Sequence, residues 1–429
     1  MATIPMPRSI RSVQNPVGLY FRVGYNDHKT VSAAIATGKR QFSGIVIEAH
    51  RLDRHKEVLS SAEAATLECI LDPCTQALAM PGGFTESLGE LPWGLGHVNR
   101  LRDYDTSKLL PLCTSIAKFA VTNRFSEVLA PTHVLSGPED PWLKVDVQAT
   151  RGLRAQLDRN GGKRIGLIYA LTISYATLRD EAARNQIVDQ LEGLPIDALW
   201  IRVDPFGDNS TGTAVRNFVD AAHDFHRLGR PLVADQVGGL VGLALVAMSA
   251  VGGLAHGITA KERFGASHWR NESESKGFAL PHRVYLPALD MLWMPNEVRR
   301  LFDSSTMLRS HFGCADPSCC PRGVTDMVEN AGLHFLQQRM NQIVTLGQMP
   351  DSLRPREFLD RYARPTADAA TRFALSSALD DAERKRIVKH RKRLDLLRVA
   401  LTDLIGTSRA ATRSVLPETR AAREFRMER

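Results

Sequence analysis

The sequence lacks a long hydrophobic run and the apolar core of a secretion signal. Its most apolar stretch, residues 231–258, is interrupted by Asp235, Gln236 and His256. It is therefore not the continuous segment of about 20 apolar residues that a membrane-spanning helix needs. The first residues, MATIPMPRSIRS, carry no apolar region of the signal-peptide type. These absences argue against a membrane protein.

Cysteine is scarce as well, with six residues scattered over 429. Such a content excludes a disulfide-stapled secreted scaffold and indicates reduced thiols, so we expect a cytoplasmic protein. A third absence concerns nucleotide binding, because no G-x-G-x-x-G motif follows the first predicted strand. The phosphate-binding fingerprint of dinucleotide-binding sheets is therefore missing.

The composition is that of a globular protein with a sizeable core, at 43% hydrophobic and 24% charged residues. The length suits one large domain plus an appendage. A net charge of +8 and a pI near 9.3 are compatible with a polyanionic partner such as nucleic acid.

Short apolar runs alternate with helical patterns from residue 18 to residue 255. This alternation predicts an α/β fold, a (β/α)₈ TIM-like barrel, although an open doubly wound sheet would alternate in the same way. We expect the barrel at 1–275, a zinc-binding module at 276–345 and a basic helical extension at 346–429. The predicted strands are 18–24, 44–49, 69–72, 128–135, 164–171, 198–203, 231–234 and 252–255.

Barrels carry their chemistry at the carboxyl ends of the strands. Asp72, Asp204 and Asp235 each end an apolar run, and a carboxylate there is costly to bury unless it is paired. We expect the three to converge on one mouth, although any one alone could cap a loop. The other polar residues at predicted strand ends are Asn26, Asp27, His28, Glu48, His50, Gln76, Thr132, His133, Thr172, Ser174, Tyr175, Arg202, Gln236 and His256.

Glycines bracket the loops after the seventh and eighth predicted strands, at Gly238, Gly239, Gly242, Gly252 and Gly253. In barrels these loops often hold a phosphate through backbone N–H groups and a helix N-terminus. Close helix–strand packing would explain the same glycines.

Half of the cysteines lie in one segment, at Cys314, Cys319 and Cys320, and His334 follows at the start of a predicted helix. Three thiols and one imidazole make a ligand set for a structural, tetrahedral Zn²⁺. His311 is a reserve fourth ligand. The alternative is that the thiols are reduced packing residues.

A predicted barrel followed by three cysteines and a histidine that leads into HFLQQRMNQI resembles the queuine/archaeosine tRNA-guanine transglycosylase superfamily, which includes relatives acting on DNA. The resemblance runs from about residue 44 to 345. The ligand types and their order match the zinc site of that family, but their spacing differs. The segment from Asp72 to Gln76, DPCTQ, offers an Asp and a Gln as the substrate-base motif of the family does.

The resemblance implies exchange or modification of a guanine base in tRNA or DNA by a glycosyltransferase. Where the family carries its nucleophilic Asp, at the eighth strand, this chain has His256. The nucleophile is therefore expected to be Asp235 or Asp204, with Asp72 handling protons. The expected substrate-binding residues are Gln76, Arg202, Gln236, Gly238 and Gly239.

Other functions stay open from the sequence. One is a barrel hydrolase or lyase for a phosphorylated small molecule, with His256 as acid or base. Another is an inactive nucleic-acid-binding component, in which the basic run 381–394 would contact phosphates unless it is only a solvated face. A metal site from His28, His50, His133 and His256 is a further alternative. A homo-oligomer is also compatible with the sequence.

Overall fold

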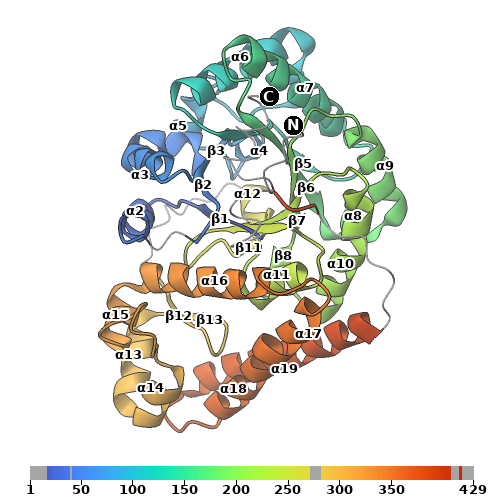
Figure 1. Cartoon of the computed structure of the whole chain (residues 1–429). Helices are drawn as coiled ribbons and strands as arrows, with labels where there is room; N and C mark the ends of the chain where they lie inside the picture. Colours follow the sequence, from blue (N-terminus) through green and yellow to red (C-terminus); the bar gives the residue numbers. More distant parts are fainter. Residues whose placement is uncertain (1–16, 39–40, 271–281, 407–414, 418–429) are drawn as a thin grey trace, which may run out of the picture.

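The computed structural model describes residues 17–38, 41–270, 282–406 and 415–417. Eight parallel strands form one sheet in the order β4-β3-β2-β1-β10-β9-β7-β6, and β6 pairs back onto β4. The ring is closed, which confirms the predicted barrel and rules out the open sheet (Figure 1). Its strands are β1 (Gly18–Arg22), β2 (Gly44–Glu48), β3 (Glu68–Asp72), β4 (Glu127–Leu129), β6 (Gly166–Ser174), β7 (Ala198–Asp204), β9 (Leu232–Asp235) and β10 (Gly253–His256).

The fourth predicted strand, 128–135, is split in two. Its first part is β4, its second part is the short β5 (Val134–Leu135), and both pair with β6. Pro131 lies in the interruption. Proline has no N–H to donate, so a continuous inner strand cannot pass through it.

Helices surround the barrel and follow the strands they connect (Figure 1). Helix α11 is buried along its whole length, because α16 and α17 of the C-terminal part cover it. The helices of the barrel part are α2 (His28–Ala36), α3 (Leu52–Ala64), α4 (Thr75–Leu78), α5 (Glu86–Gly89), α6 (Thr106–Thr122), α7 (Pro141–Arg159), α8 (Tyr175–Arg179), α9 (Glu181–Leu191), α10 (Gly212–His226), α11 (Gly239–Ala247) and α12 (Ser267–Arg270).

The inside of the barrel has two layers. Side chains alternate along a strand, so residues two apart point to the same face. An apolar cluster fills the lower layer, and it consists of Tyr20, Val46, Ile70, Leu129, Ile168, Ala170, Trp200, Val233 and Ala255. Two residues further toward the carboxyl ends, the inward positions are polar, and they are Arg22, Glu48, Asp72, Thr172, Arg202 and Asp235. An apolar floor thus supports a charged layer at the mouth.

The opposite end of the barrel is crossed by residues 415–417. Val415 pairs with Pro231 beside β9. A cavity of about 220 Å³ lies there, between Tyr20 and Trp200 of the barrel floor and Leu416. The end of the described chain therefore covers the amino-terminal opening of the barrel.

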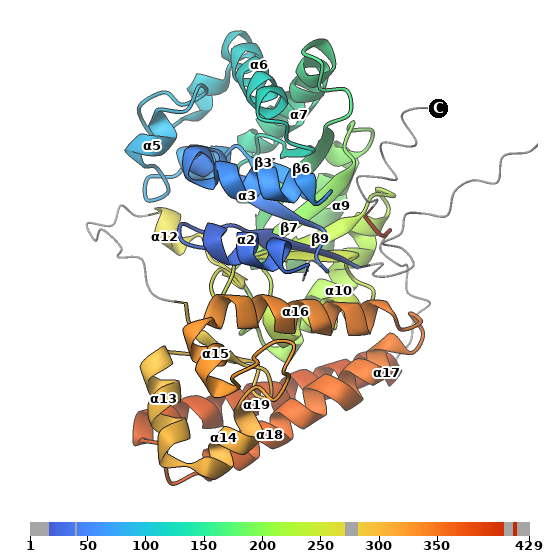
Figure 2. The same ribbon diagram turned by 60° about the vertical axis from the view of Figure 1, so that its left-hand side comes forward.

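The chain after the barrel forms a hairpin and a helical layer on one side of it (Figures 1 and 2). Helix α16 packs on α2 and α11, and α19 packs on α10. The expected boundary at residue 345 falls inside α16. These elements are β12 (Val284–Leu286), β13 (Met291–Trp293), α13 (Pro295–Ser304), α14 (Thr306–Phe312), α15 (Val324–Glu329), α16 (Ala331–Gly347), α17 (Arg354–Phe358), α18 (Arg364–Ala374) and α19 (Asp381–Gly406). Among the described residues no helix combines the length and apolarity that crossing a bilayer would need.

Candidate functional site

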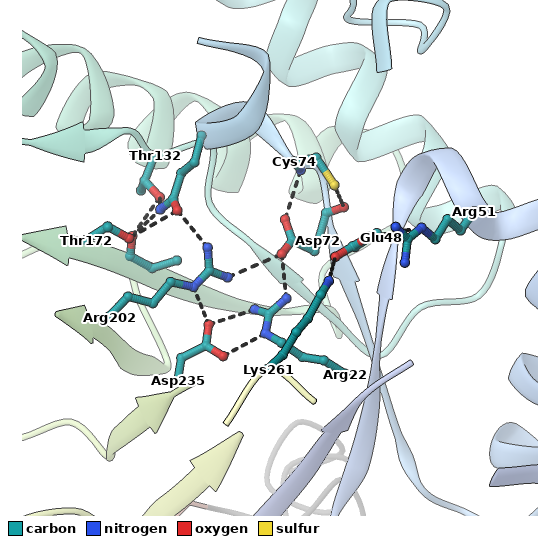
Figure 3. A network of polar contacts seen from close by, with 12 residues as sticks. Arg22, Glu48, Arg51, Asp72, Cys74, Thr132, Thr172, Arg202, Asp235 and Lys261 are labelled. Carbon is teal, nitrogen blue, oxygen red and sulfur yellow. Dashed lines mark hydrogen bonds and ion pairs between the residues drawn. The ribbon is translucent and has the colours of Figure 1, made fainter. Parts of the chain in front are cut away.

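Two arginines and two aspartates form a closed network in the polar layer of the barrel (Figure 3). Arg22 donates to Asp235 through Nε and Nη2, both at 2.7 Å, and to Asp72 through Nη1 at 2.8 Å. Arg202 donates to Asp235 through Nε at 2.6 Å and to Asp72 through Nη2 at 3.3 Å. Each arginine therefore bridges the ends of β3 and β9.

Gln76 extends this network to the far wall of the barrel. Its Oε1 accepts from Nη1 of Arg202 at 2.6 Å and from the hydroxyl of Thr172 at 3.1 Å. Its Nε2 donates to Oγ1 of Thr132 at 3.0 Å and to the carbonyl of Ala170 at 3.1 Å. The structure thus brings Asp72, Gln76, Arg202 and Asp235 together at one mouth, and all four are buried.

The electrostatics of the network fix its protonation state. Burial alone would raise the pKa of Asp72 and of Asp235, but the two adjacent guanidinium groups outweigh it and lower the pKa of both carboxyls. Both groups are therefore carboxylates near neutral pH. Such a buried set is expensive to desolvate, and perturbed, paired groups of this kind are typical of functional sites.

A second ion pair lies at the rim of the mouth (Figure 3). Glu48, at the end of β2, accepts from Nζ of Lys261 at 2.8 Å and lies 3.2 Å from Nε of Arg51. Burial would raise the pKa of Glu48, yet these cations hold it well below its usual range. Cys74 lies beside the pair, with Sγ 3.8 Å from Nδ1 of His50, and burial raises the pKa of its thiol. The thiol is therefore a packing group at neutral pH.

Asp204 ends β7 at the same mouth but does not join the network. Its Oδ1 accepts from the backbone N–H of Ala266 at 2.9 Å, and its Oδ2 pairs with Arg270. The three aspartates therefore do not converge as expected: two share the arginines, and the third holds the segment after β10.

His256 does not point into the mouth. It pairs in register with Phe21, while its neighbour Ala255 belongs to the apolar floor, so its side chain is on the outer face of β10. It packs edge-on against Phe21 and Phe335 of α16, and burial lowers its pKa to about 4. This corrects the expectation of a catalytic His256. Side chains alternate along a strand, and position 256 falls on the outer face of β10. Gln236 adopts a positive φ of 57°, and its backbone N–H donates to the carbonyl of Ala255 at 2.6 Å.

The amides at the start of α11 are already bonded within the chain. The N–H of Gly239 donates to Oε1 of Glu262 at 3.0 Å, and that of Leu240 donates to Oδ2 of Asp290 at 2.7 Å. A Cβ at position 238 would lie 2.2 Å from Oε1 of Glu262, which explains Gly238. The expected phosphate contact at Gly238 and Gly239 is therefore blocked in this structure by two carboxylates of the chain itself.

The predicted metal ligands lie together. One atom each of Cys314, Cys319, Cys320 and His334 falls within 4.8 Å of the others. Sγ of Cys319 lies 3.8 Å from Sγ of Cys320 and 3.3 Å from Nδ1 of His334. Two sulfurs on one tetrahedral ion are about 3.8 Å apart, and a sulfur and a nitrogen about 3.6 Å, so the distances fit. The reserve ligand His311 is exposed and instead bonds the carbonyl of Met307.

A carbonyl orients the histidine of this group. Nε2 of His334 lies 2.9 Å from the carbonyl oxygen of Tyr285, to which it donates. That bond leaves the lone pair of Nδ1 directed at the sulfurs, as in metal sites whose ligand histidine is oriented by an outer acceptor. The four groups can therefore bind a metal ion.

The strand-end histidines do not make a second metal site. His133 is paired with Asp146 of α7 at 2.6 Å and stacks on Trp142, so it packs outside the barrel. His28 lies next to His55, between α2 and α3. Within the described ranges, the cysteine–histidine group is where three or more metal-type ligands meet.

The basic run of α19 is only partly a solvated face. Arg384 donates to the carbonyls of Ala374 and Ser376, and Arg386 lies over the ring of Trp293. These arginines hold the helical layer together. The exposed cations of the run are Lys385, Lys389 and Lys392.

Sequence reasoning missed Arg22 and Lys261. Arg22 was recognisable, because it is a charge inside an apolar strand and lies two positions from Tyr20, on the inward face. Lys261 carried no such signal, since it lies in an irregular segment whose path over the mouth depends on tertiary contacts.

The fold and the network together define a (β/α)₈-barrel protein with a polar site at the carboxyl ends of its strands. No protein-family model and no curated protein matches the chain. Similar solved structures include a GH18 chitinase from Pseudoalteromonas aurantia, at 11% identity over 56% of this chain and 92% of that one, with a TM-score of 0.37. A 3-dehydroquinate dehydratase from Enterococcus faecalis has 10% identity over 58% and 92%, with a TM-score of 0.33. Likenesses this distant carry no inference about activity.

Proposed function

We propose that the mouth of the barrel binds a guanine-type base of a nucleic acid and exchanges it, as the resemblance to the transglycosylase superfamily implies. The observation that supports this most is the buried network of Asp72, Gln76, Arg202 and Asp235. It combines ionised carboxylates with amide and guanidinium groups that can read the edge of a base, on a floor of apolar side chains.

In this proposal Asp72 is the carboxylate that faces the anomeric carbon. All three carboxylates are engaged, since Oδ1 of Asp72 accepts from the N–H of Cys74 and its Oδ2 accepts from both arginines. The side chain of Asp72 is the most exposed of the three, at 12% against 7% for Asp204 and 0% for Asp235. The carboxylate of Asp72 would form a bond to C1′ as the C1′–N bond of the base breaks. The departing base takes the electron pair of that bond and a proton from solvent. An incoming base would then attack C1′, lose a proton to solvent and release Asp72 as the carboxylate. Arg202 and Gln76 would bind the departing base, while Asp235 holds the arginines in place.

The exposed lysines of α19 would contact phosphates of the nucleic acid. Lys385, Lys389 and Lys392 recur at helical spacing on the solvent side. Binding through such contacts releases counterions and weakens steeply as salt rises. The ion in the cysteine–histidine group would be a structural Zn²⁺, because three thiolates and one imidazole are the ligands that such sites use.

The test is incorporation of labelled guanine into tRNA and into duplex DNA. Wild-type protein should incorporate the label into one of them, Asp72→Asn should not, and the surface variant Asp189→Asn should behave as wild type. Folded, metal-loaded protein that incorporates label into neither polymer would overturn the proposal, as would full activity of Asp72→Asn.

A second candidate is a nucleic-acid-binding protein without turnover. It is favoured by the engagement of both oxygens of Asp72, Asp204 and Asp235 in contacts within the chain. Such a protein would show salt-dependent binding that Asp72→Asn leaves unchanged. The phosphorylated small molecule is less well supported, since Glu262 and Asp290 already bond the amides at the start of α11.

A further inference from the structure

We infer that Arg339 is a positioning residue, which couples the metal group of the C-terminal part to the segment that covers the barrel mouth. The inference deepens the proposed function, because that segment borders the proposed base site. Arg339 is on α16, five residues after the metal-type ligand His334. It is 2% exposed.

Arg339 bridges the segment after β10 and the β12–β13 hairpin. Its Nε and Nη2 donate to Oε1 of Glu262 at 3.1 and 2.8 Å. Its Nη1 donates to Oδ1 of Asp290 at 3.0 Å and to the hydroxyl of Tyr285 at 2.8 Å. Glu262 and Asp290 in turn bond the first amides of α11. We call Arg339, Glu262 and Asp290 the latch.

Glu262 is in the middle of the segment that runs from β10 across the mouth, residues 257–270. Its carbonyl accepts from the N–H groups of Asp208 and Gly238, at 2.9 and 3.0 Å. The next residues pair with the short strand β8 (Phe206–Gly207), through β11 (Arg263–Phe264). Glu262 therefore joins the segment to the loops that follow β7 and β9 and, through Arg339, to α16.

The segment reaches the candidate site on both sides of Glu262, through Lys261 directly before it and Arg270 at the end of the segment. Lys261 holds Glu48 on one side of the mouth, and Arg270 holds Asp204 on the other. The carbonyl of Trp269 accepts from Gly82, in the turn after α4, at 2.8 Å. A change at Glu262 would consequently alter the positions of side chains on opposite sides of the mouth.

Tyr285 contacts both the metal group and the latch, which are also connected through helix α16. The carbonyl of Tyr285 accepts from His334, and its hydroxyl accepts from Arg339 and donates to Asp290. The guanidinium of Arg339 also lies over the ring of Tyr285, 4.3 Å from its centre. Binding of an ion by His334 thus fixes the same tyrosine and helix that aim Arg339 at Glu262.

Because the latch is buried away from water, we expect its ion pairs to be either fully formed or fully lost. Burial raises the pKa of Glu262, although Arg339 opposes this by stabilising the carboxylate. A carboxylate and a guanidinium removed from water are stable only with their partners in place. Loss of either partner should therefore release the segment instead of merely loosening it.

The experiment is amide hydrogen exchange with the metal content measured in parallel, on full-length Arg339→Gln and Glu262→Gln. We expect exchange at Asp208, Gly238, Gly239 and Ala266 to rise by at least about tenfold in both variants, while one ion per chain stays bound. Chelation of the wild-type ion should raise exchange at the same amides. Arg300→Gln, which removes an ion pair to Glu383 inside the helical layer, is the matched control and should leave them unchanged.

The outcomes separate a positioning role from general stability. Equal increases in β6 and β7 would mean that the whole chain is destabilised, and would overturn the inference. Unchanged exchange at the four amides in Glu262→Gln would overturn it too, as would chelation that affects only residues 312–335. None of these readouts uses nucleic acid, so the latch and base exchange can fail independently.

Discussion

At the scale of single residues, the mouth depends on charges that neutralise one another away from water. Asp235 is the centre of this balance, since it accepts three hydrogen bonds from Arg22 and Arg202. Two positions earlier in the same strand, the floor residue Val233 is apolar. The transition from apolar to charged therefore occurs within two positions of one strand.

Asp235→Asn should destabilise the fold by about 3–5 kcal/mol, because it leaves two buried guanidinium groups short of one negative charge. Urea unfolding measures this. Asp189→Asn removes an exposed pair with Arg227 and should cost below about 1 kcal/mol. Equal stability of Asp235→Asn and wild type would contradict the network.

A buried histidine should lower the free energy of unfolding in acid. His55 is fully buried, neither ring nitrogen has a hydrogen-bond partner among the described residues, and its pKa is lowered to about 4, chiefly by burial. A folded pKa below the unfolded value of about 6.5 gives stability that is present above pH 6.5 and lost as the pH falls toward 4. The change in the free energy of unfolding caused by His55→Leu should therefore be more favourable at pH 5 than at pH 7, by about 1–2 kcal/mol. Thermal melts at both pH values measure this, and an equal effect at both would contradict it.

At the scale of elements, the residues after the barrel pack against it through α16 and α19. Helix α16 carries His334 on one side and Arg339 on another, and it packs on α2 and α11. The cysteine segment precedes it in a turn-rich path between α14 and α15. The metal group therefore lies at the junction of the helical layer and the barrel.

Cys319→Ser should abolish stoichiometric zinc binding and lower the melting temperature, because the remaining three groups cannot complete a tetrahedral site. Elemental analysis and calorimetry measure both. Cys113→Ser, which alters a buried thiol bonded to Ala149, should retain the ion. Zinc retained in full by Cys319→Ser would remove Cys319 from the ligand set.

At the scale of the whole molecule, the sequence predicted the barrel and its eight strands because buried parallel strands leave a local signal. The convergence of Cys314, Cys319, Cys320 and His334 was predicted from the ligand types and from three of the four lying within seven residues. The direction of His256 could not be predicted, since one residue of register decides whether a strand side chain faces in or out. The filling of the glycine loops by Glu262 and Asp290 depends on contacts across 23 and 50 residues.

In the proposed reaction, Asp72 bonds to the sugar of a nucleic acid while the base is exchanged. Mass spectrometry of protein quenched in acid during labelled-guanine exchange tests it most directly. The expected result is a nucleotide-linked peptide that contains Asp72. Exchange that proceeds while every Asp72 peptide stays unmodified, or while the link forms at Asp204 or Asp235, would contradict it.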